Sequence, residues 1–279
     1  MQRVFIERLR ELGWVEGQNV EIELRRAEGK AEILTALASD LVQRRVDVIV
    51  TSGTTAIGAA RQVTETVPIV MAGGGDPVAS GLVTSLRRPG GNITGVSLLG
   101  QELVPKGLSL LREIMPKAKR VDLLANAANP ANAFFGNVTA EAAHALGMES
   151  RLLEVRKPDE LEAAIAGTQA QAILALADPM FNLHARRIAD AAIKRRLPLA
   201  SFGRIYVEAG SLMSYAVNFS DVFRLAAEYT DRILRGAKPA DLPIEQPTRY
   251  ELIVNLRTAR ALRVTIPQSL LLRADQVIE

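Results

Sequence analysis

The residues of this chain that could bind or transform a small molecule come directly after short apolar runs. The first set follows the run that ends near Thr51, and the second follows Val67–Ala72. Later runs end in asparagines, an aspartate and a phenylalanine. The candidate residues are Ser52, Gly53, Thr54, Thr55, Gly74, Gly75, Asp76, Asn126, Asn129, Asp178 and Phe202. These residue types form hydrogen bonds and stack on rings, which favours binding over catalysis.

Groups that catalyse reactions are scarce. The chain has no cysteine, which excludes thiolate metal sites and cysteine nucleophiles. Its two histidines, His144 and His184, fall in helical patterns without a nucleophile elbow or a metal-binding H-E-x-x-H motif. We therefore expect no catalytic residue and no metal site.

Two glycine-containing segments resemble nucleotide-binding loops only in part. Residues 53–58 begin like a phosphate loop, but Ala59 stands where the motif requires lysine. Residues 73–78 do not complete G-x-G-x-x-G, because Val78 takes the place of the last glycine. The net charge of +3 is thinly spread, which disfavours nucleic-acid binding. We expect no cofactor.

Two candidate groups would attract opposite charges on a ligand. The helix expected from Thr54 to Glu65 has hydroxyl residues and free N–H groups at its start, which suits a carboxylate. Asp178 ends another strand and could bind an ammonium group, which together implies a zwitterionic ligand. Because we expect Asp178 to face a wet cleft, its replacement by Asn should leave ligand-free stability unchanged. Alternatively, Thr54 or Thr55 caps its own helix, and Asp76 and Asp178 are turn residues before proline.

The elements that would position these residues alternate between strand and helix, which predicts parallel sheets with ligands at the carboxyl ends of the strands. Strands are expected near 46–53, 67–73, 120–126, 148–155, 171–178, 197–203 and 211–217. We expect a helix from Phe181 to Arg196, and another with Ser220 as N-cap and Gly236 just after its end. The fold class is α/β with two Rossmann-like lobes, residues 1–97 plus 217–244 and residues 98–216 plus 245–279, joined by a three-segment hinge.

Four long segments carry a family resemblance: Leu9–Gly29, residues 46–56, Val67–Ser97 and residues 233–278. With them the chain resembles the ABC-transporter substrate-binding family related to tryptophan-binding proteins of the TrpX type. The resemblance implies a type I periplasmic-binding-protein fold and an extracytoplasmic protein. It also implies an amino-acid-like or aromatic carboxylate ligand between closing lobes, and an ABC permease as the only link to the membrane. At the matching positions of this chain, the resemblance implies that the candidate residues named above contact the ligand.

The chain departs from that family in two places. The signal segment and first strand that precede the Leu9 motif in the family are missing, so we expect the first strand of lobe 1 to be absent. In the loop of lobe 2, this chain has "ADPMFN" where family members more usually have a sequence of the type Asp-Asn-Thr. Pro179 removes a hydrogen-bond donor from this loop. Two other classes stay open: the ligand-sensing domain of a transcriptional regulator, and an α/β enzyme, which the shortage of catalytic groups disfavours.

Overall fold

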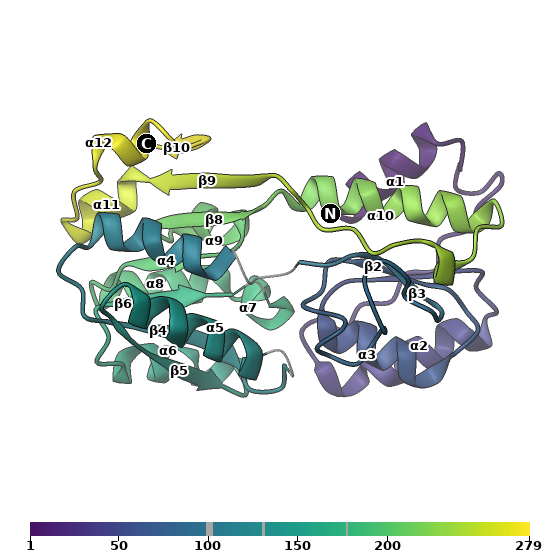
Figure 1. The fold of residues 1–279 in the computed structure, drawn as a ribbon, viewed down its shortest axis with the longest axis horizontal. Coiled ribbons are helices and arrows are strands. Elements are labelled where there is room, and N and C mark those ends of the chain that lie inside the picture. The colour runs from purple at the N-terminus through teal and green to yellow at the C-terminus, as the bar shows by residue number, and fades with distance from the viewer. Residues whose placement is uncertain (99–102, 130–131, 177) are drawn as a thin grey trace. The chain divides into compact units, whose positions relative to one another are not determined.

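The computed structural model describes residues 1–98, 103–129, 132–176 and 178–279 (Figure 1). The chain divides into two compact units. Unit 1 comprises Met1–Leu99 and Asn218–Thr248, and unit 2 comprises Gly100–Val217 and Arg249–Glu279. The chain therefore passes from one unit to the other three times. Among the described residues, no helix combines the length and apolar character that crossing a membrane requires.

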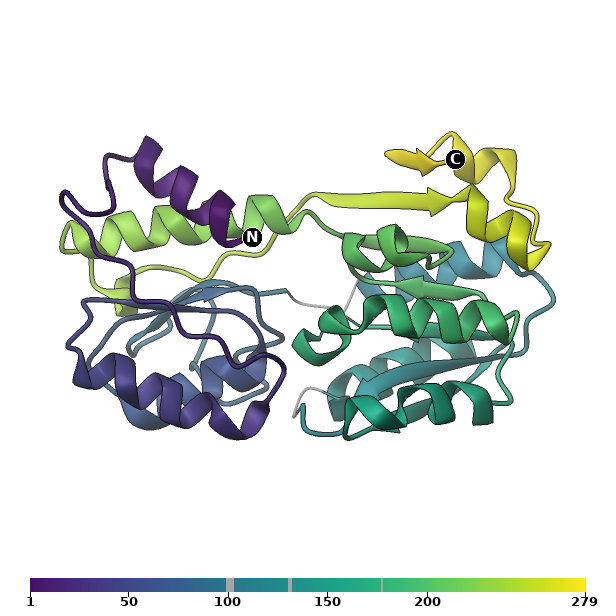
Figure 2. The same ribbon diagram turned by 180° about the vertical axis from the view of Figure 1, so that it is seen from behind.

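Unit 1 is built on a three-stranded parallel sheet in the order β1-β2-β3. Its core is continuous because Ile49, Ile69 and Ile93 face one another across the three strands and are all buried. Helices α2 and α3 cover one face of the sheet, and α1 and α10 cover the other (Figures 1 and 2). The elements are α1 (Gln2–Glu11), α2 (Leu34–Gln43), β1 (Ile49–Thr51), α3 (Thr54–Val63), β2 (Ile69–Ala72), β3 (Ile93–Val96) and α10 (Phe219–Leu234).

Helix α1 is fastened to α10 by polar contacts between segments more than 200 residues apart. Arg8 pairs with Glu228 at 2.7 Å, and Arg224 pairs with Glu11 at 2.8 Å. The indole N–H of Trp14 donates to Asp231 Oδ1 at 2.8 Å. The residues ahead of Leu9 thus form the helix that holds α10, and the sheet of unit 1 takes its strands from residue 49 onward.

Unit 2 contains a seven-stranded sheet in the order β10-β9-β8-β7-β6-β4-β5. Five of its strands, β4 to β8, follow the expected parallel arrangement, but β9 pairs with β8 in the antiparallel direction and β10 runs parallel to β9. The reason is connectivity: the chain leaves the sheet at the carboxyl end of β8 for unit 1 and re-enters beside it. The strands are β4 (Arg120–Asn126), β5 (Glu149–Val155), β6 (Ala172–Ala175), β7 (Leu199–Ser201), β8 (Met213–Val217), β9 (Tyr250–Asn255) and β10 (Gln276–Ile278).

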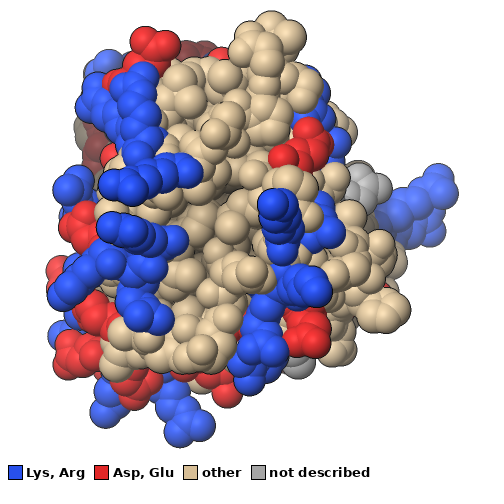
Figure 3. All heavy atoms as spheres, turned by 90° about the vertical axis from the view of Figure 1, so that its left-hand side faces the viewer, with Lys and Arg blue, Asp and Glu red and all other residues tan. Residues whose placement is uncertain are grey.

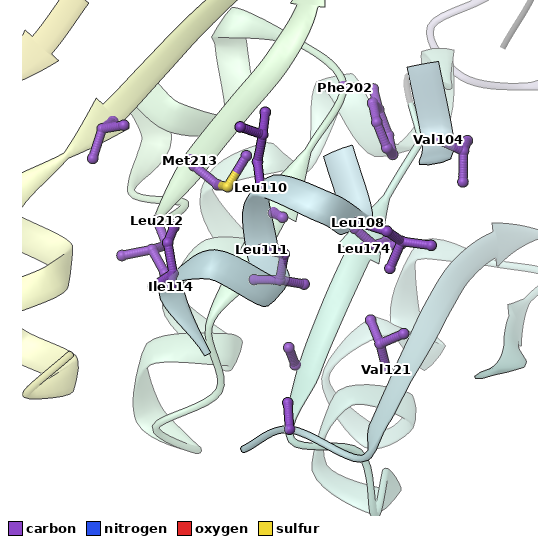
Figure 4. Close-up of a cluster of buried hydrophobic side chains, with 14 of the residues drawn as sticks. Val104, Leu108, Leu110, Leu111, Ile114, Val121, Leu174, Phe202, Leu212 and Met213 are labelled. Atoms are coloured by element: carbon purple, nitrogen blue, oxygen red, sulfur yellow. The ribbon is translucent and has the colours of Figure 1, made fainter. Parts of the chain in front are cut away.

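Helices cover both faces of this sheet, with α4 and α5 in front in Figure 1 and α6 and α8 in front in Figure 2. The close-up in Figure 4 shows leucines of α4 beside Leu174 of β6 and Met213 of β8 in the larger core. The helices are α4 (Leu103–Ile114), α5 (Asn132–Ala145), α6 (Leu161–Gly167), α7 (Pro179–Leu183), α8 (Ala185–Lys194), α9 (Arg204–Ala209), α11 (Leu256–Leu262) and α12 (Gln268–Leu271). Short 3-10 turns lie at Ala31–Ile33, Pro158–Glu160 and Pro239–Asp241.

Two expected helix boundaries are wrong. Helix α10 starts at Phe219, and its N-cap is Asn218, whose side chain accepts from the N–H of Ser220 at 2.8 Å. The stop is as expected, since Gly236 follows the helix with a φ of 98°. The single helix expected from Phe181 to Arg196 is two helices, because His184 leaves helical geometry at φ −111° and ψ 17°.

Candidate functional site

In unit 1 the candidate residues form two loops that are tied to each other. The N–H of Gly53 donates to the carbonyl of Gly73 at 2.7 Å, and the Ser52 hydroxyl donates to the same oxygen at 3.3 Å. Gly53 and Gly73 both have a φ of 90°, in the region that glycine adopts without strain. The loops after β1 and β2 therefore form one structure at the carboxyl edge of the sheet.

Thr54 joins these loops to the start of α3. Its hydroxyl oxygen accepts from the N–H of Gly75 at 2.9 Å, and its side chain is buried. Helix α3 has Gly53 as N-cap and no side-chain capping bond, so neither Thr54 nor Thr55 caps it. The start of a helix leaves its first N–H groups without intrahelical acceptors, and here they belong to Thr54, Thr55 and Ala56. This is a conventional environment for a carboxylate.

The second loop of unit 1 depends on small residues and a turn. A Cβ on Gly74 would lie 2.6 Å from Cδ1 of Ile57, so a larger residue there would require the end of the Ile57 side chain to move. The carboxylate of Asp76 accepts from the N–H groups of Val78 and Ala79 at 2.9 and 3.0 Å. Asp76 thus has the turn-forming role that was one of the two interpretations of its position before proline.

In unit 2, Asp178 organises the loops at the carboxyl edge. Its Oδ1 accepts from the side-chain amide of Asn126 at 3.0 Å and from the N–H of Met180 at 2.9 Å. Its Oδ2 accepts from the side-chain amide of Asn129 at 3.1 Å. Asp178 is therefore the N-cap of α7 and also the acceptor for both candidate asparagines, which lie 49 and 52 positions earlier in the sequence.

Asp178 is only 4% exposed, which corrects the expectation of a solvent-facing side chain. Within the described residues its charge has no Lys or Arg partner and is stabilised by amide donors alone. A carboxylate offers about four acceptor positions, and three are used here. A buried carboxylate without a cationic partner is the complement of a ligand ammonium group.

The asparagines form a tight turn after β4. The Asn129 N–H donates to the Asn126 carbonyl at 2.8 Å, and the Ala128 N–H donates to Asn126 Oδ1 at 3.0 Å. Both asparagines thus take part in the turn, and each donates its side-chain amide to Asp178.

Two aromatic side chains that follow β7 are buried. Phe202 is 3% exposed and packs against α4, where a Cβ on Gly107 would lie 2.6 Å from its ring. Tyr206 is fully buried and donates to the carbonyl of Leu176 at 3.1 Å. Burial, and secondarily the charge of Asp178, raise the pKa of Tyr206 well above its ordinary value, so this hydroxyl stays protonated. The structure places Phe202 in the core of unit 2.

A pair of aromatic rings was missed by the sequence analysis. Phe134 and Phe135 lie in the first turn of α5, at the same edge of the sheet as Asn129, and are half-buried. Their ring centroids are 5.4 Å apart in an edge-to-face arrangement. The adjacent pair was a visible signal in the sequence, but an amphipathic helix pattern gave it no separate meaning. Among the described residues, no three His, Cys, Asp or Glu side chains gather as a metal site.

Comparison with known families gives one match that spans almost the whole chain. Residues 2–278 match the family described as ABC transporter substrate binding protein. A curated relative, the tyrosine-binding protein of Clostridioides difficile (strain R20291), is 26% identical over 265 residues, which cover 92% of this chain and 75% of the relative.

Two solved structures share the fold closely. A conserved domain protein from Vibrio cholerae is 27% identical with a TM-score of 0.95, over 99% of this chain and 93% of that one. The ABC domain in complex with L-Trp from Streptococcus pneumonia is 25% identical with a TM-score of 0.93, with the same coverage. These relatives confirm the type I periplasmic-binding-protein fold, set the chain among substrate-binding proteins instead of enzymes, and give the regulator alternative no support.

Proposed function

Because this chain belongs to the family of ABC transporter substrate binding proteins, we propose that it captures a free aromatic amino acid outside the cytoplasm. It would then deliver this ligand to an ABC permease for import. The observation that carries the proposal is Asp178, a buried carboxylate held by three amide donors and by no cation of the described chain. Such a group favours a positively charged ligand atom.

The other end of the ligand is assigned to unit 1. The first turn of α3 offers backbone N–H groups and the positive end of the helix dipole, which attract a carboxylate. Thr54 fixes this turn against Gly75, so the donors are already in place before a ligand arrives. We assign both sets of loops to the same ligand: the ammonium group to Asp178 and the carboxylate to the start of α3.

The aromatic part of the proposal is supported by the relatives and by unit 2. One relative is called a tyrosine-binding protein, and another was solved with L-Trp. Phe134 and Phe135 supply partly exposed rings beside the asparagine turn, and aromatic rings pack well against an indole or a phenol. Aliphatic amino acids would gain less from this pair.

A thermal-shift screen tests the proposal with ligands that differ at one end. L-Tryptophan and L-tyrosine keep both charges, tryptamine lacks the carboxylate, and indole-3-propionate lacks the ammonium group. A ligand at 100 times its Kd stabilises the folded protein by about 2.7 kcal/mol. We expect a clear rise in Tm with the amino acids and little with either truncated ligand. An equal rise with indole-3-propionate would remove Asp178 from the proposed role.

A further inference from the structure

One edge of unit 2 carries a concentration of positive charge. Because strands β4 to β8 run parallel, the loops that lead into them share an edge, and β9 ends there because it runs antiparallel. The loop segments are 115–119, 146–148, 168–171, 194–198, 210–212 and 260–267, and they contain no Asp or Glu. Their cations, which we call the basic edge, are Lys117, Lys119, Lys194, Arg195, Arg196, Arg260 and Arg263.

The cations of the basic edge are not neutralised by the protein. All seven residues are exposed, and within the described chain none has a side-chain hydrogen bond or ion pair. Two nearby acids are already paired, Glu113 with Arg273 and Glu149 with Arg120. A third, Glu279, is exposed just after β10, which ends at the same edge. Figure 3 shows Lys and Arg side chains in groups on either side of a largely uncharged area. The seven cations of the basic edge outnumber this exposed acid, so the edge presents a net positive surface.

Two of these arginines occupy backbone positions that favour glycine. Arg196 and Arg263 follow helices α8 and α11 with φ values of 55° and 56°. The corresponding residues after α5 and α10 are Gly147 and Gly236. A side chain in the left-handed region is strained, so arginine at these two positions does not serve the stability of the fold.

An exposed leucine adjoins the same edge. Leu272 is 78% exposed, the highest value among the large apolar residues that the structure describes. It follows α12 and precedes Arg273, whose pairing with Glu113 holds this segment against the last turn of α4. An apolar side chain among cations is the pattern of surfaces that lie on lipid headgroups.

We propose that the basic edge of unit 2 docks on a membrane surface rich in anionic lipid. Anionic headgroups attract basic segments over about a Debye length, and Leu272 would insert among the headgroups. A nucleic acid explains the cations less well, because the loop segments of the basic edge contain no aromatic residue for base stacking. This docking is independent of the small-molecule ligand, and it gives the protein a contact with the membrane besides the permease.

The test is co-sedimentation with vesicles. One set contains phosphatidylcholine alone, and the other contains phosphatidylcholine and phosphatidylglycerol in equal amounts. We expect binding to the anionic vesicles only, weakening as salt shortens the screening length. The triple variant Lys194→Gln, Arg195→Gln, Arg196→Gly should bind about a hundredfold more weakly, at about fivefold per cation. Leu272→Ser should weaken binding further without changing its salt dependence.

A matched triple variant in unit 1 controls for net charge. Arg45→Gly, Arg87→Gln, Arg88→Gln also removes three exposed cations, and Arg45 has a φ of 58°, like Arg196. We expect this control to keep full vesicle binding. Both triple variants should show an unchanged or raised Tm, because each replaces a strained arginine with glycine. The proposal would be overturned if the two triple variants lost vesicle binding equally. It would also be overturned if the wild type bound polyglutamate as strongly as it binds the anionic vesicles.

Discussion

At the scale of single residues, Asp178 combines support of the fold with the proposed recognition of the ligand. Asp178→Asn replaces one acceptor oxygen with an amide that faces donors from Asn126, Asn129 or Met180. We expect a loss of about 1–3 kcal/mol in the free energy of unfolding without ligand, the cost of unpaired buried donors. Urea denaturation measures it. Stability equal to the wild type would show that these hydrogen bonds contribute nothing.

Thr54 permits a cleaner comparison, because valine exchanges the hydroxyl for a methyl group at nearly the same volume, whereas serine keeps the hydroxyl and loses the methyl group. Thr54→Val leaves the N–H of Gly75 without its acceptor, whereas Thr54→Ser keeps it. We expect the valine variant to lose about 1–3 kcal/mol in the free energy of unfolding and the serine variant to lose less. Ligand affinity should follow the same order, as measured by calorimetry. Matching affinities in the two variants would separate Thr54 from the proposed carboxylate site.

At the scale of elements, α1 and α10 form a pair that the single tryptophan can report. Trp14 is the only tryptophan of the chain, and its indole binds Asp231 on α10. Asp231→Ala removes this acceptor and the partner of Arg235. We expect the emission of Trp14 to shift to longer wavelength while the far-ultraviolet circular dichroism stays constant. An unshifted emission maximum would mean that α1 packs on α10 without this contact.

The same helix pair should respond to acid. Hydrogen bonds from Arg224 and then Arg8 lower the pKa of Glu11 in the folded protein. A carboxyl whose pKa is lowered by folding stabilises the fold above its ordinary pKa, and this contribution is lost as the pH falls through the lowered value. We expect a titration of Trp14 emission to be flat from neutral pH downward and to change only below the ordinary range for glutamate. Glu11→Gln should abolish that part of the change.

The elements were largely predictable from sequence, and the contacts between distant ones were not. Apolar runs before polar residues located β1, β2, β6 and β7 well, because buried parallel strands leave that pattern. The same pattern could not show that β9 runs antiparallel, which depends on where the chain re-enters unit 2. It could not show the split at His184 either, since the sequence continues in helical periodicity.

For the candidate site, the sequence located the loops but not the partners within them. Asp178 was singled out for its position at a strand end, yet its bonds to Asn126 and Asn129 span about fifty residues and depend on β4 lying beside β6. The family resemblance implied Phe202 as a ligand contact, and the sequence did not show that its ring packs in the core against Gly107. Such pairings arise from packing, which single positions do not encode.

At the scale of the whole molecule, we propose that each of the two units contributes one charge-complementary set of loops to ligand binding. The start of α3 in unit 1 offers donors, and Asp178 in unit 2 offers a buried negative charge. If both sets of loops bind one amino acid, variants in either unit must lower the affinity for the same ligand. A ligand recovered after long incubation should also be chemically unchanged, since the described residues of the candidate loops include no nucleophile with an adjacent base.

Calorimetric titration with L-tryptophan, compared among the wild type, Asp178→Asn and Thr54→Val, tests the central claim most directly. We predict that the wild type binds with one site per chain and that each variant loses about 1.5–3 kcal/mol of affinity, the range for a hydrogen bond to a charged group. L-Tyrosine is titrated in parallel, because a preference between the two aromatic amino acids is compatible with the proposal. Wild-type affinity for both amino acids in both variants would contradict the claim that these loops hold the two charged ends of one ligand.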